Sequence, residues 1–385
     1  MEIKVNSTNK EEFNIYMKII DKHLLKEHLT PVFYCLFGFT ILAIILELQG
    51  DVKYFVKANL PMIYIVRFYI CSMGEMIDYL LPAALLFATL YVLWHLTNSN
   101  ELMAIRTSGI SFYRMMEPFI LIGLGFSLLL MTLRLNVIPN GLQWKEMLKS
   151  NDFLVEQQKP KDNVTYYNII DKRIWEMGQY LPESKTNNTT IYNLQLTQER
   201  DNSAREWVMD VDKAQYLDGE WWFYDVQDII YYDENDNPVE NQSNLFSADE
   251  SHLMRINKLN ETPFDINLEQ KNWDYLTIKE KNRYLTNHPE ITEIDSKKYD
   301  IYDTFSFPFS CLIAILFAIP TGAKTARSNP LSTIFIAIFA FFGYYSLYVL
   351  SEYLCKRGIL PPLFAAWLAN LVFLTIGGYM TIRMH

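Results

Sequence analysis

The sequence has few cysteines and none of the short motifs that identify the common enzyme classes. Its four cysteines lie in or beside apolar runs, so they predict neither a disulfide framework nor a paired-cysteine metal site. The sequence contains no GxxxxGK followed by Ser or Thr, no HExxH and no GxSxG, so it offers no P-loop, zincin motif or nucleophile elbow. We therefore expect no enzymatic activity and no cofactor or metal in this chain.

Clusters of basic residues are also missing. No run of Lys and Arg is large enough to follow a phosphate backbone, which argues against nucleic acid as a partner. The formal net charge of −10 comes from residues 140–303, which hold 18 basic and 32 acidic side chains. The remaining residues hold 16 basic and 12 acidic side chains. The sequence is therefore an acidic block inserted into a slightly basic chain.

Long apolar runs dominate the chain outside this block. A membrane-spanning helix needs about 20 apolar residues, and six uncharged runs approach or exceed that length. They lie at residues 29–46, 79–96, 118–133, 304–323, 328–351 and 358–382. One such run would fit a buried core helix, but six do not. We predict a membrane α-helical protein with six spans in a 3 + 3 arrangement, divided into domains at 1–139, 140–303 and 304–385.

The distribution of Lys and Arg predicts the orientation of the spans. With the N-terminus in the cytoplasm, the inner segments carry ten Lys or Arg and the short outer loops carry four. Cytoplasmic segments are enriched in Lys and Arg, so we expect both termini to be cytoplasmic. Residues 140–303 are then periplasmic, in a bacterial inner membrane, and residues 98–113 face the cytoplasm.

Charged residues precede the second apolar run. The helical pattern that starts at Pro61 passes Arg67, Glu75 and Asp78 before the uncharged residues begin, and Pro82 predicts a kink. Polar groups at that depth face a cavity or a partner and not lipid.

The acidic block is predicted to be β-rich. Short stretches alternate apolar and polar residues, as in 192–197 and 222–227, and Asp218-Gly219 is a hairpin signal. Polar turns such as 233–238 separate the stretches, which suggests a sandwich, a jelly roll or a similar fold. Residues 277–287 predict a short helix capped at Thr277, with Glu280 three positions later.

A polar patch, residues 98–113 (NSNELMAIRTSGISFY), lies between the second and third apolar runs. We expect Asn98 to cap a short helix at 98–110, with Glu101 as the reciprocal partner. Gly109 would end the helix in the left-handed conformation, and Ser111 would cap the next one. Glu101 and Arg106 are either ordinary solvated charges or part of a docking surface for a second protein. A capped cytoplasmic helix favours docking.

Four basic residues are expected at the outer boundary of the membrane. They are Lys53, Lys57, Arg67 and Arg134. Such residues commonly extend their charged ends to the lipid head groups. The alternative is a ring that binds an anionic lipid head group beside a cavity, which makes these four residues head-group candidates.

Several segments together resemble the lipopolysaccharide export permeases, the LptF/LptG (YjgP/YjgQ-like) family. The resemblance covers nearly the whole chain, and its most specific part is the polar patch with the residues before it. The segments are 81–86 (LPAALL), 100–111 (NELMAIRTSGIS), 136–140 (NVIPN), 218–221 (DGEW) and 358–362 (GILPP). The first of them leans toward the LptG-like paralogue. Asp303 departs from the pattern, because the family usually carries a basic residue shortly before the proline of the fourth span.

This resemblance implies a function for the polar patch. The chain would be a permease subunit of an ABC transporter that extracts lipopolysaccharide from the inner membrane and passes it through a periplasmic β-jellyroll to a bridge protein. Its partners would be a cytoplasmic LptB-like ATPase dimer, which hydrolyses the ATP, a paralogous six-span permease and an LptC-like single-span protein. The residues implied for ATPase coupling are Glu101, Leu102, Ile105, Arg106 and Gly109.

A second function remains open at this point. A membrane-anchored sensor or assembly scaffold would also use an acidic β-domain to bind a protein. Such a scaffold explains the acidic block, but it does not explain six spans with a short helix between the second and third. Co-purification of a P-loop ATPase and a second six-span permease would favour the transporter.

Overall fold

The computed structural model divides the chain into two compact units. The membrane unit contains Met1–Leu142 and Asp295–His385, and the β unit contains Gln143–Ile294. The structure describes residues 7–58, 60–149, 160–182, 188–234, 236–239, 253–255, 259–289, 293–325 and 330–383.

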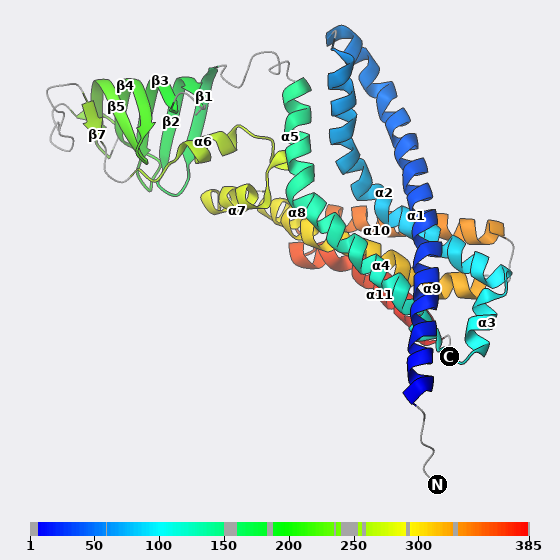
Figure 1. Cartoon of the computed structure of the whole chain (residues 1–385). Helices are drawn as coiled ribbons and strands as arrows, with labels where there is room; N and C mark the ends of the chain where they lie inside the picture. The colour runs from blue at the N-terminus through cyan, green and yellow to red at the C-terminus, as the bar shows by residue number, and fades with distance from the viewer. Residues whose placement is uncertain are drawn as a thin grey trace. The chain divides into compact units, whose positions relative to one another are not determined.

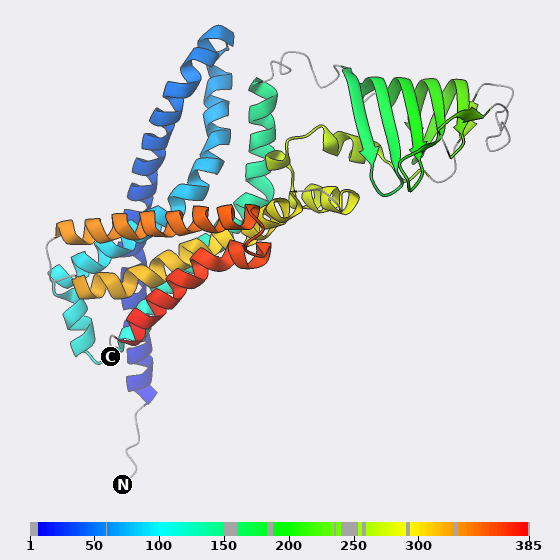
Figure 2. The same cartoon turned by 180° about the vertical axis from the view of Figure 1, so that it is seen from behind.

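The membrane unit is built from long helices (Figures 1 and 2). Six of its helical segments are long and apolar enough to cross a membrane, which confirms the predicted number of spans. They are Ile19–Lys53, Met62–Asn98, Phe112–Glu146, Ile294–Ala323, Ile334–Lys356 and Pro362–Ile382. The fourth begins ten residues before the apolar run that predicted it, because the amphipathic helix before that run continues into it.

The helices of the membrane unit follow in chain order. They are α1 (Ser7–Ala58), α2 (Met62–Asn98), α3 (Glu101–Thr107), α4 (Phe112–Thr132), the π-helical turn η1 (Leu133–Val137), α5 (Ile138–Lys149, which continues into the β unit), α8 (Ile294–Ser306), η4 (Phe307–Phe309), α9 (Ser310–Thr325), α10 (Pro330–Lys356) and α11 (Pro362–Ile382). Helix α2 bends along its length in both views, and Pro82 lies near its midpoint. A proline inside a helix removes one hydrogen bond and kinks the axis, as predicted.

The predicted helix in the polar patch is present, but one of its caps was predicted wrongly. Helix α2 runs to Asn98, and the Ser99 hydroxyl donates back to the His95 carbonyl at 2.9 Å, so this segment ends a helix and does not begin one. Asn100 takes a left-handed conformation before α3 starts. The other two expectations are confirmed: Gly109 is left-handed at φ +87°, and the Ser111 hydroxyl accepts the Arg114 amide.

The β unit contains one antiparallel sheet whose strands follow each other in sequence order. Its strands are β1 (Lys161–Asn168), β2 (Arg173–Leu181), β3 (Thr190–Glu199), β4 (Arg205–Leu217), β5 (Glu220–Tyr232), β6 (Pro238–Val239) and β7 (Leu253–Arg255), with β7 paired to β5. Asp218 and Gly219 both have positive φ and join β4 to β5, as expected for a tight hairpin. The sheet confirms the predicted inserted β domain.

One face of the sheet forms the core of the β unit. Trp221 and Phe223 are buried on β5, and Trp175 packs against both. The pairing of β4 with β5 shifts by one residue between Asp210 and Val211, and this shift changes which side chains of β5 face inward. The chain after the sheet forms α6 (Pro263–Glu269), η3 (Trp273–Tyr275) and α7 (Ile278–Asn287). The predicted capping box of Thr277 and Glu280 is present at the start of α7.

Candidate functional site

Helix α3 presents one face to the membrane unit and the other face to solvent. Leu102 is buried in the core that also contains Leu96 and Met115, and Ile105 packs against the same core. Met103 and Arg106 lie on the exposed face. A seven-residue helix is too short to be stable alone, so the buried face fixes α3 on the ends of α2 and α4. The exposed face is then available to a second protein.

Glu101, the first residue of α3, is bonded to its own chain through both carboxylate oxygens. His23 of α1 lies with its Nε2 3.1 Å from one oxygen, and the Ser99 hydroxyl donates to the other at 3.1 Å. The His23 hydrogen bond is the main reason that the pKa of Glu101 is lowered from its usual value. The carboxylate is therefore ionised at neutral pH and held toward α1.

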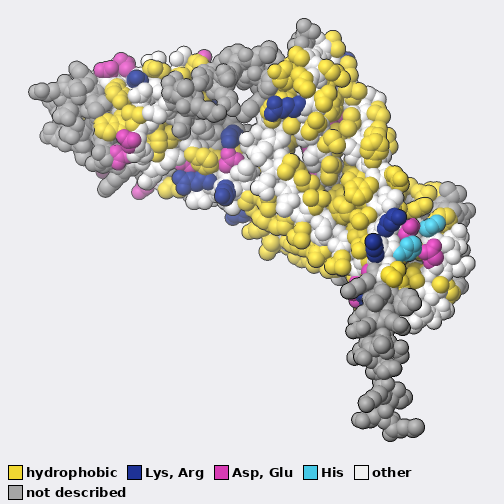
Figure 3. Space-filling view, in the orientation of Figure 1, with side chains coloured by type: hydrophobic (Ala, Val, Ile, Leu, Met, Phe, Trp, Pro, Cys, Tyr) yellow, Lys and Arg dark blue, Asp and Glu magenta, His cyan; other side chains and the backbone are white. Residues whose placement is uncertain are grey.

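A second contact joins the same part of α1 to the start of α4. Arg114 donates to Asp21 at 2.6 Å and also pairs with Glu117, one turn later on α4. His23 thus contacts Glu101 near the start of the segment 99–111, which we call the α3 loop, and Asp21 contacts Arg114 just after its end. Figure 3 shows His, acidic and basic side chains gathered on this part of a surface that is otherwise mainly hydrophobic.

A groove of about 720 Å³ lies beside these contacts, between α1, α2 and α10. One wall begins at Lys26 and Glu27, one turn along α1 from His23, and another carries Tyr91, Trp94 and His95 of α2. Deeper in the groove the lining is apolar. Its volume lies within the range of about 300–1,000 Å³ that is common for small-molecule pockets.

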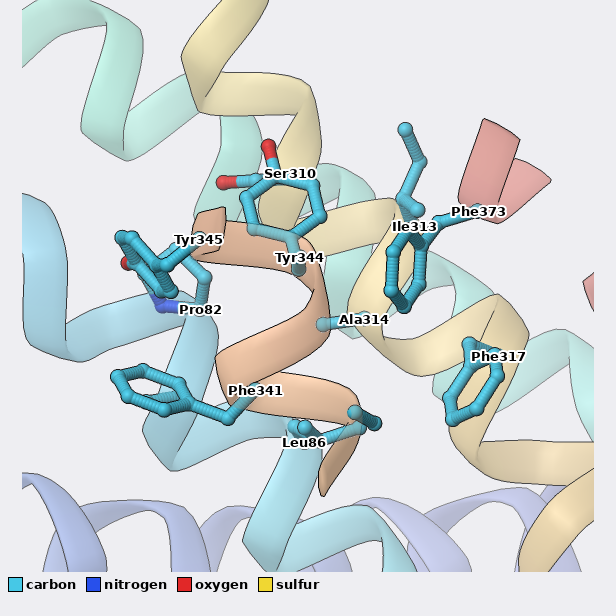
Figure 4. A pocket seen from close by; sticks show the side chains of 12 residues that line it. Pro82, Leu86, Ser310, Ile313, Ala314, Phe317, Phe341, Tyr344, Tyr345 and Phe373 are labelled. Atoms are coloured by element: carbon cyan, nitrogen blue, oxygen red, sulfur yellow. The ribbon is translucent and has the colours of Figure 1, made fainter. Parts of the chain in front are cut away.

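A second cavity, between α2, α9, α10 and α11, is too small for a ligand (Figure 4). Its volume is about 30 Å³, and Pro82, Tyr344 and Phe373 are among its lining side chains. A cavity of this size holds one or two water molecules at most. We interpret it as a packing gap beside the proline in α2.

Three of the four head-group candidates lie at the connection between α1 and α2. Lys53 and Lys57 are near the end of α1, and Arg67 is near the start of α2. The Lys53 and Arg67 side chains are exposed, whereas the side chain of Lys57 lies outside the described residues. Figures 1 and 2 show this connection at the opposite end of the membrane unit from α3.

Arg134 lies apart from the other three candidates, and only 10% of its side-chain surface is exposed. Its Nε and Nη2 donate to the two carboxylate oxygens of Asp78 at 2.7 and 2.8 Å, and its Nη1 donates to the Asp303 carboxylate at 2.8 Å. The guanidinium also lies 4.1 Å from the centre of the Phe307 ring. A π-helical turn often marks a functional site, and η1 places Arg134 between α2 and α8.

The ion-pair cluster of Asp78, Arg134 and Asp303 has an excess of one negative charge. Both Asp residues are less than a tenth exposed. Asp303 Oδ2 also accepts the Tyr348 hydroxyl at 2.9 Å, but Asp303 Oδ1 is buried and meets no hydrogen-bond partner among the described residues. The cluster thus joins α2, η1, α8 and α10. The expectation that Asp78 would face a partner and not lipid is confirmed, but the sequence did not identify the partner.

Within the described residues, no group of three or more His, Cys, Asp or Glu side chains is arranged to hold a metal ion. Some buried polar side chains of the membrane unit contact each other, as where the Tyr344 hydroxyl donates to Asn370 at 2.9 Å. The geometry thus offers an exposed helix, a groove and a buried ion-pair cluster as candidate functional features.

Comparisons with known proteins identify the family. No curated protein matches the chain. A family described as the lipopolysaccharide export system permease LptF/LptG matches residues 22–383, which includes the β unit and the six spans except the first three residues of the first span. The chain therefore belongs to the LptF/LptG family of lipopolysaccharide export permeases and is a multi-pass protein of the inner membrane.

Proposed function

We propose that this chain is one of two paralogous permease subunits through which a separate cytoplasmic ATPase drives lipopolysaccharide out of the inner membrane. The family is one of permeases in an ABC-type export system, and the sequence contains no P-loop of its own. The energy must then enter through a contact with another protein. An LptC-like single-span protein and a periplasmic bridge complete the proposed assembly, and which of the two paralogues this chain represents stays a prediction.

The observation that carries this proposal is the exposed face of α3. Leu102 and Ile105 anchor the helix, Gly109 ends it, and Met103 and Arg106 face outward. Glu101 lies at the start of the same helix. We propose that the ATPase dimer binds this face and moves α2 and α4 through it. This arrangement requires both termini in the cytoplasm and the β unit in the periplasm, which agrees with the distribution of Lys and Arg.

A co-purification experiment tests the docking surface. Arg106→Glu reverses the exposed charge of α3, and we expect the ATPase to be lost from the purified complex. Arg383→Glu, at the exposed C-cap of α11, is a matched charge reversal outside α3 and should retain the ATPase. Retention of the ATPase by the Arg106 variant at the wild-type amount would contradict docking on α3.

Lipopolysaccharide would contact the connection between α1 and α2. We propose that Lys53, Lys57 and Arg67 bind the phosphorylated sugar head, since anionic head groups attract basic residues at a membrane boundary. Arg134 is left out of this set because Asp78 and Asp303 already occupy its donors. Charge reversal at Lys53 and Arg67 should lower photo-crosslinking to lipopolysaccharide, and unchanged crosslinking would leave only ordinary contact with lipid head groups.

A further inference from the structure

Two side chains of α1 hold it to the α3 loop from different sides. Asp21 contacts Arg114 at the start of α4, and His23 contacts Glu101 at the start of α3. Helical residues two positions apart point about 200° away from each other around the axis. The two contacts therefore hold α1 to both ends of the α3 loop. We call this pair of contacts the α1 clasp.

The α1 clasp matters because little of the apolar part of α1 is buried within the membrane unit. One further polar contact lies nearby, where His28 is hydrogen-bonded to Thr89 of α2 at 2.9 Å. Among the described side chains, polar contacts that fix α1 near α3 come from Asp21, His23 and His28. A movement of α3 reaches α2 and α4 through the backbone, and it reaches α1 through these side chains and through the apolar core that Leu24 shares with Leu102.

The groove between α1, α2 and α10 begins directly beside the clasp. Lys26 and Glu27 line its mouth one turn after His23, and His95 lines it one turn before Ser99. A displacement of the clasped part of α1 relative to α2 therefore changes the width of the groove. The contact between His23 and Glu101 therefore lies next to the proposed ATPase-binding face of α3 and also next to the groove of about 720 Å³.

We propose that His23 is a positioning residue of the ATPase-coupling site: it links Glu101 to α1, so that a movement of α3 is passed to the first span and changes the width of the groove. This inference rests on the proposed docking of an ATPase on α3. His23 does not itself bind the ATPase in this mechanism. Its Nε2 bonds to the Glu101 carboxylate, and that bond carries the motion.

The test compares two replacements of His23 in the full complex with the ATPase, reconstituted in nanodiscs that contain lipopolysaccharide. His23→Gln retains an amide N–H that can donate to Glu101, whereas His23→Leu keeps a similar volume without a donor. We expect both variants to bind the ATPase as the wild type does. Lipopolysaccharide release per ATP hydrolysed should fall about two- to fivefold in the Leu variant, as expected for the loss of a partly exposed charged contact, and should be largely kept in the Gln variant. Lys22→Leu, at the exposed neighbour, should behave as wild type.

A distance measurement on the permease alone separates this inference from the docking proposal. With spin labels at Lys22 and Met103 in a cysteine-free background, His23→Leu should broaden the distance distribution relative to His23→Gln. Unchanged distances, or a wild-type ratio of release to hydrolysis in the Leu variant, would overturn the role of His23. Loss of ATPase binding in the Leu variant would also overturn it. Retention of the ATPase by the Arg106→Glu variant would show independently that the ATPase does not dock on α3.

Discussion

Replacement of Arg134 by methionine tests whether the buried ion-pair cluster holds the spans together. Arg134 makes three side-chain hydrogen bonds to Asp78 and Asp303 and a fourth to the Asp303 carbonyl at 3.0 Å. Methionine fills similar space but leaves two carboxylates buried without a cation. Breaking a buried pair by removing one partner costs about 3–5 kcal/mol. Because two acids are left here, we expect a loss of unfolding free energy at the upper end of that range.

The two acids should respond differently to neutralisation. Both carboxylate oxygens of Asp78 accept hydrogen bonds from the Arg134 guanidinium. Asp78→Asn therefore replaces one acceptor by an amide N–H donor that faces an N–H donor of Arg134. We expect a cost of about 1.5–3 kcal/mol, as for a hydrogen bond to a charged group. In Asp303→Asn the amide oxygen can keep the bonds from Arg134 and Tyr348, while the excess negative charge is removed. The expected change for Asp303→Asn is below about 1 kcal/mol.

The assay is unfolding of the full-length protein by SDS titration in mixed micelles, followed by circular dichroism. The expected order of destabilisation is Arg134→Met, then Asp78→Asn, then Asp303→Asn. Equal losses for the two Asn variants would refute the expectation that Asp303, unlike Asp78, keeps its hydrogen bonds when it is replaced by Asn. An Arg134 variant within about 1 kcal/mol of wild type would refute a stabilising role for the cluster.

Three further predictions concern other contacts. A Cβ at Gly377 of α11 would lie 3.2 Å from the Leu316 carbonyl oxygen, whereas one at Gly378 meets nothing within 4 Å; thermal unfolding should show a loss of about 1–3 kcal/mol for Gly377→Ala and no loss for Gly378→Ala. In the β unit, Arg173→Met leaves the fully buried Glu261 carboxylate unpaired, which should cost about 3–5 kcal/mol by tryptophan fluorescence in urea. Burial raises the pKa of Asp265, but hydrogen bonds, with Arg283 first among them, outweigh it and leave the pKa below its usual value. The stabilisation is then present above the unfolded pKa of about 3.9 and is lost as pH falls through the lower folded pKa, so acid unfolding should be steeper for wild type than for Asp265→Asn.

Features set by local sequence could be predicted well. Each membrane span depends on its own apolar run, and the Asp218-Gly219 hairpin depends on two residues that accept positive φ. The α3 helix was expected for similar reasons. Its N-cap was misplaced because Ser99 bonds back to the end of α2. Asn98, Ser99 and Asn100 have the same residue types whether they end one helix or begin the next, so sequence alone does not separate these cases.

Features that join distant segments could not be predicted. Asp78 and Arg134 are 56 positions apart, and Arg134 and Asp303 are 169 positions apart. Arg134 ends an apolar run, and a basic residue there is as typical of contact with lipid head groups as of a buried ion pair. The contact between His23 and Glu101 spans 78 positions and was missed for the same reason. Only the packing of the helices decides which charges meet.

The charge at position 303 connects these observations to the path of the lipid. A basic side chain at position 303 would lie against the Arg134 guanidinium and repel it. With Asp303 in this position, Arg134 instead pairs with acids on two different helices. The positive charge of Arg134 is therefore paired with carboxylates inside the membrane unit and does not face a ligand. We therefore propose the α1–α2 connection, where Lys53 and Arg67 are exposed, as the part of this chain that attracts an anionic head group.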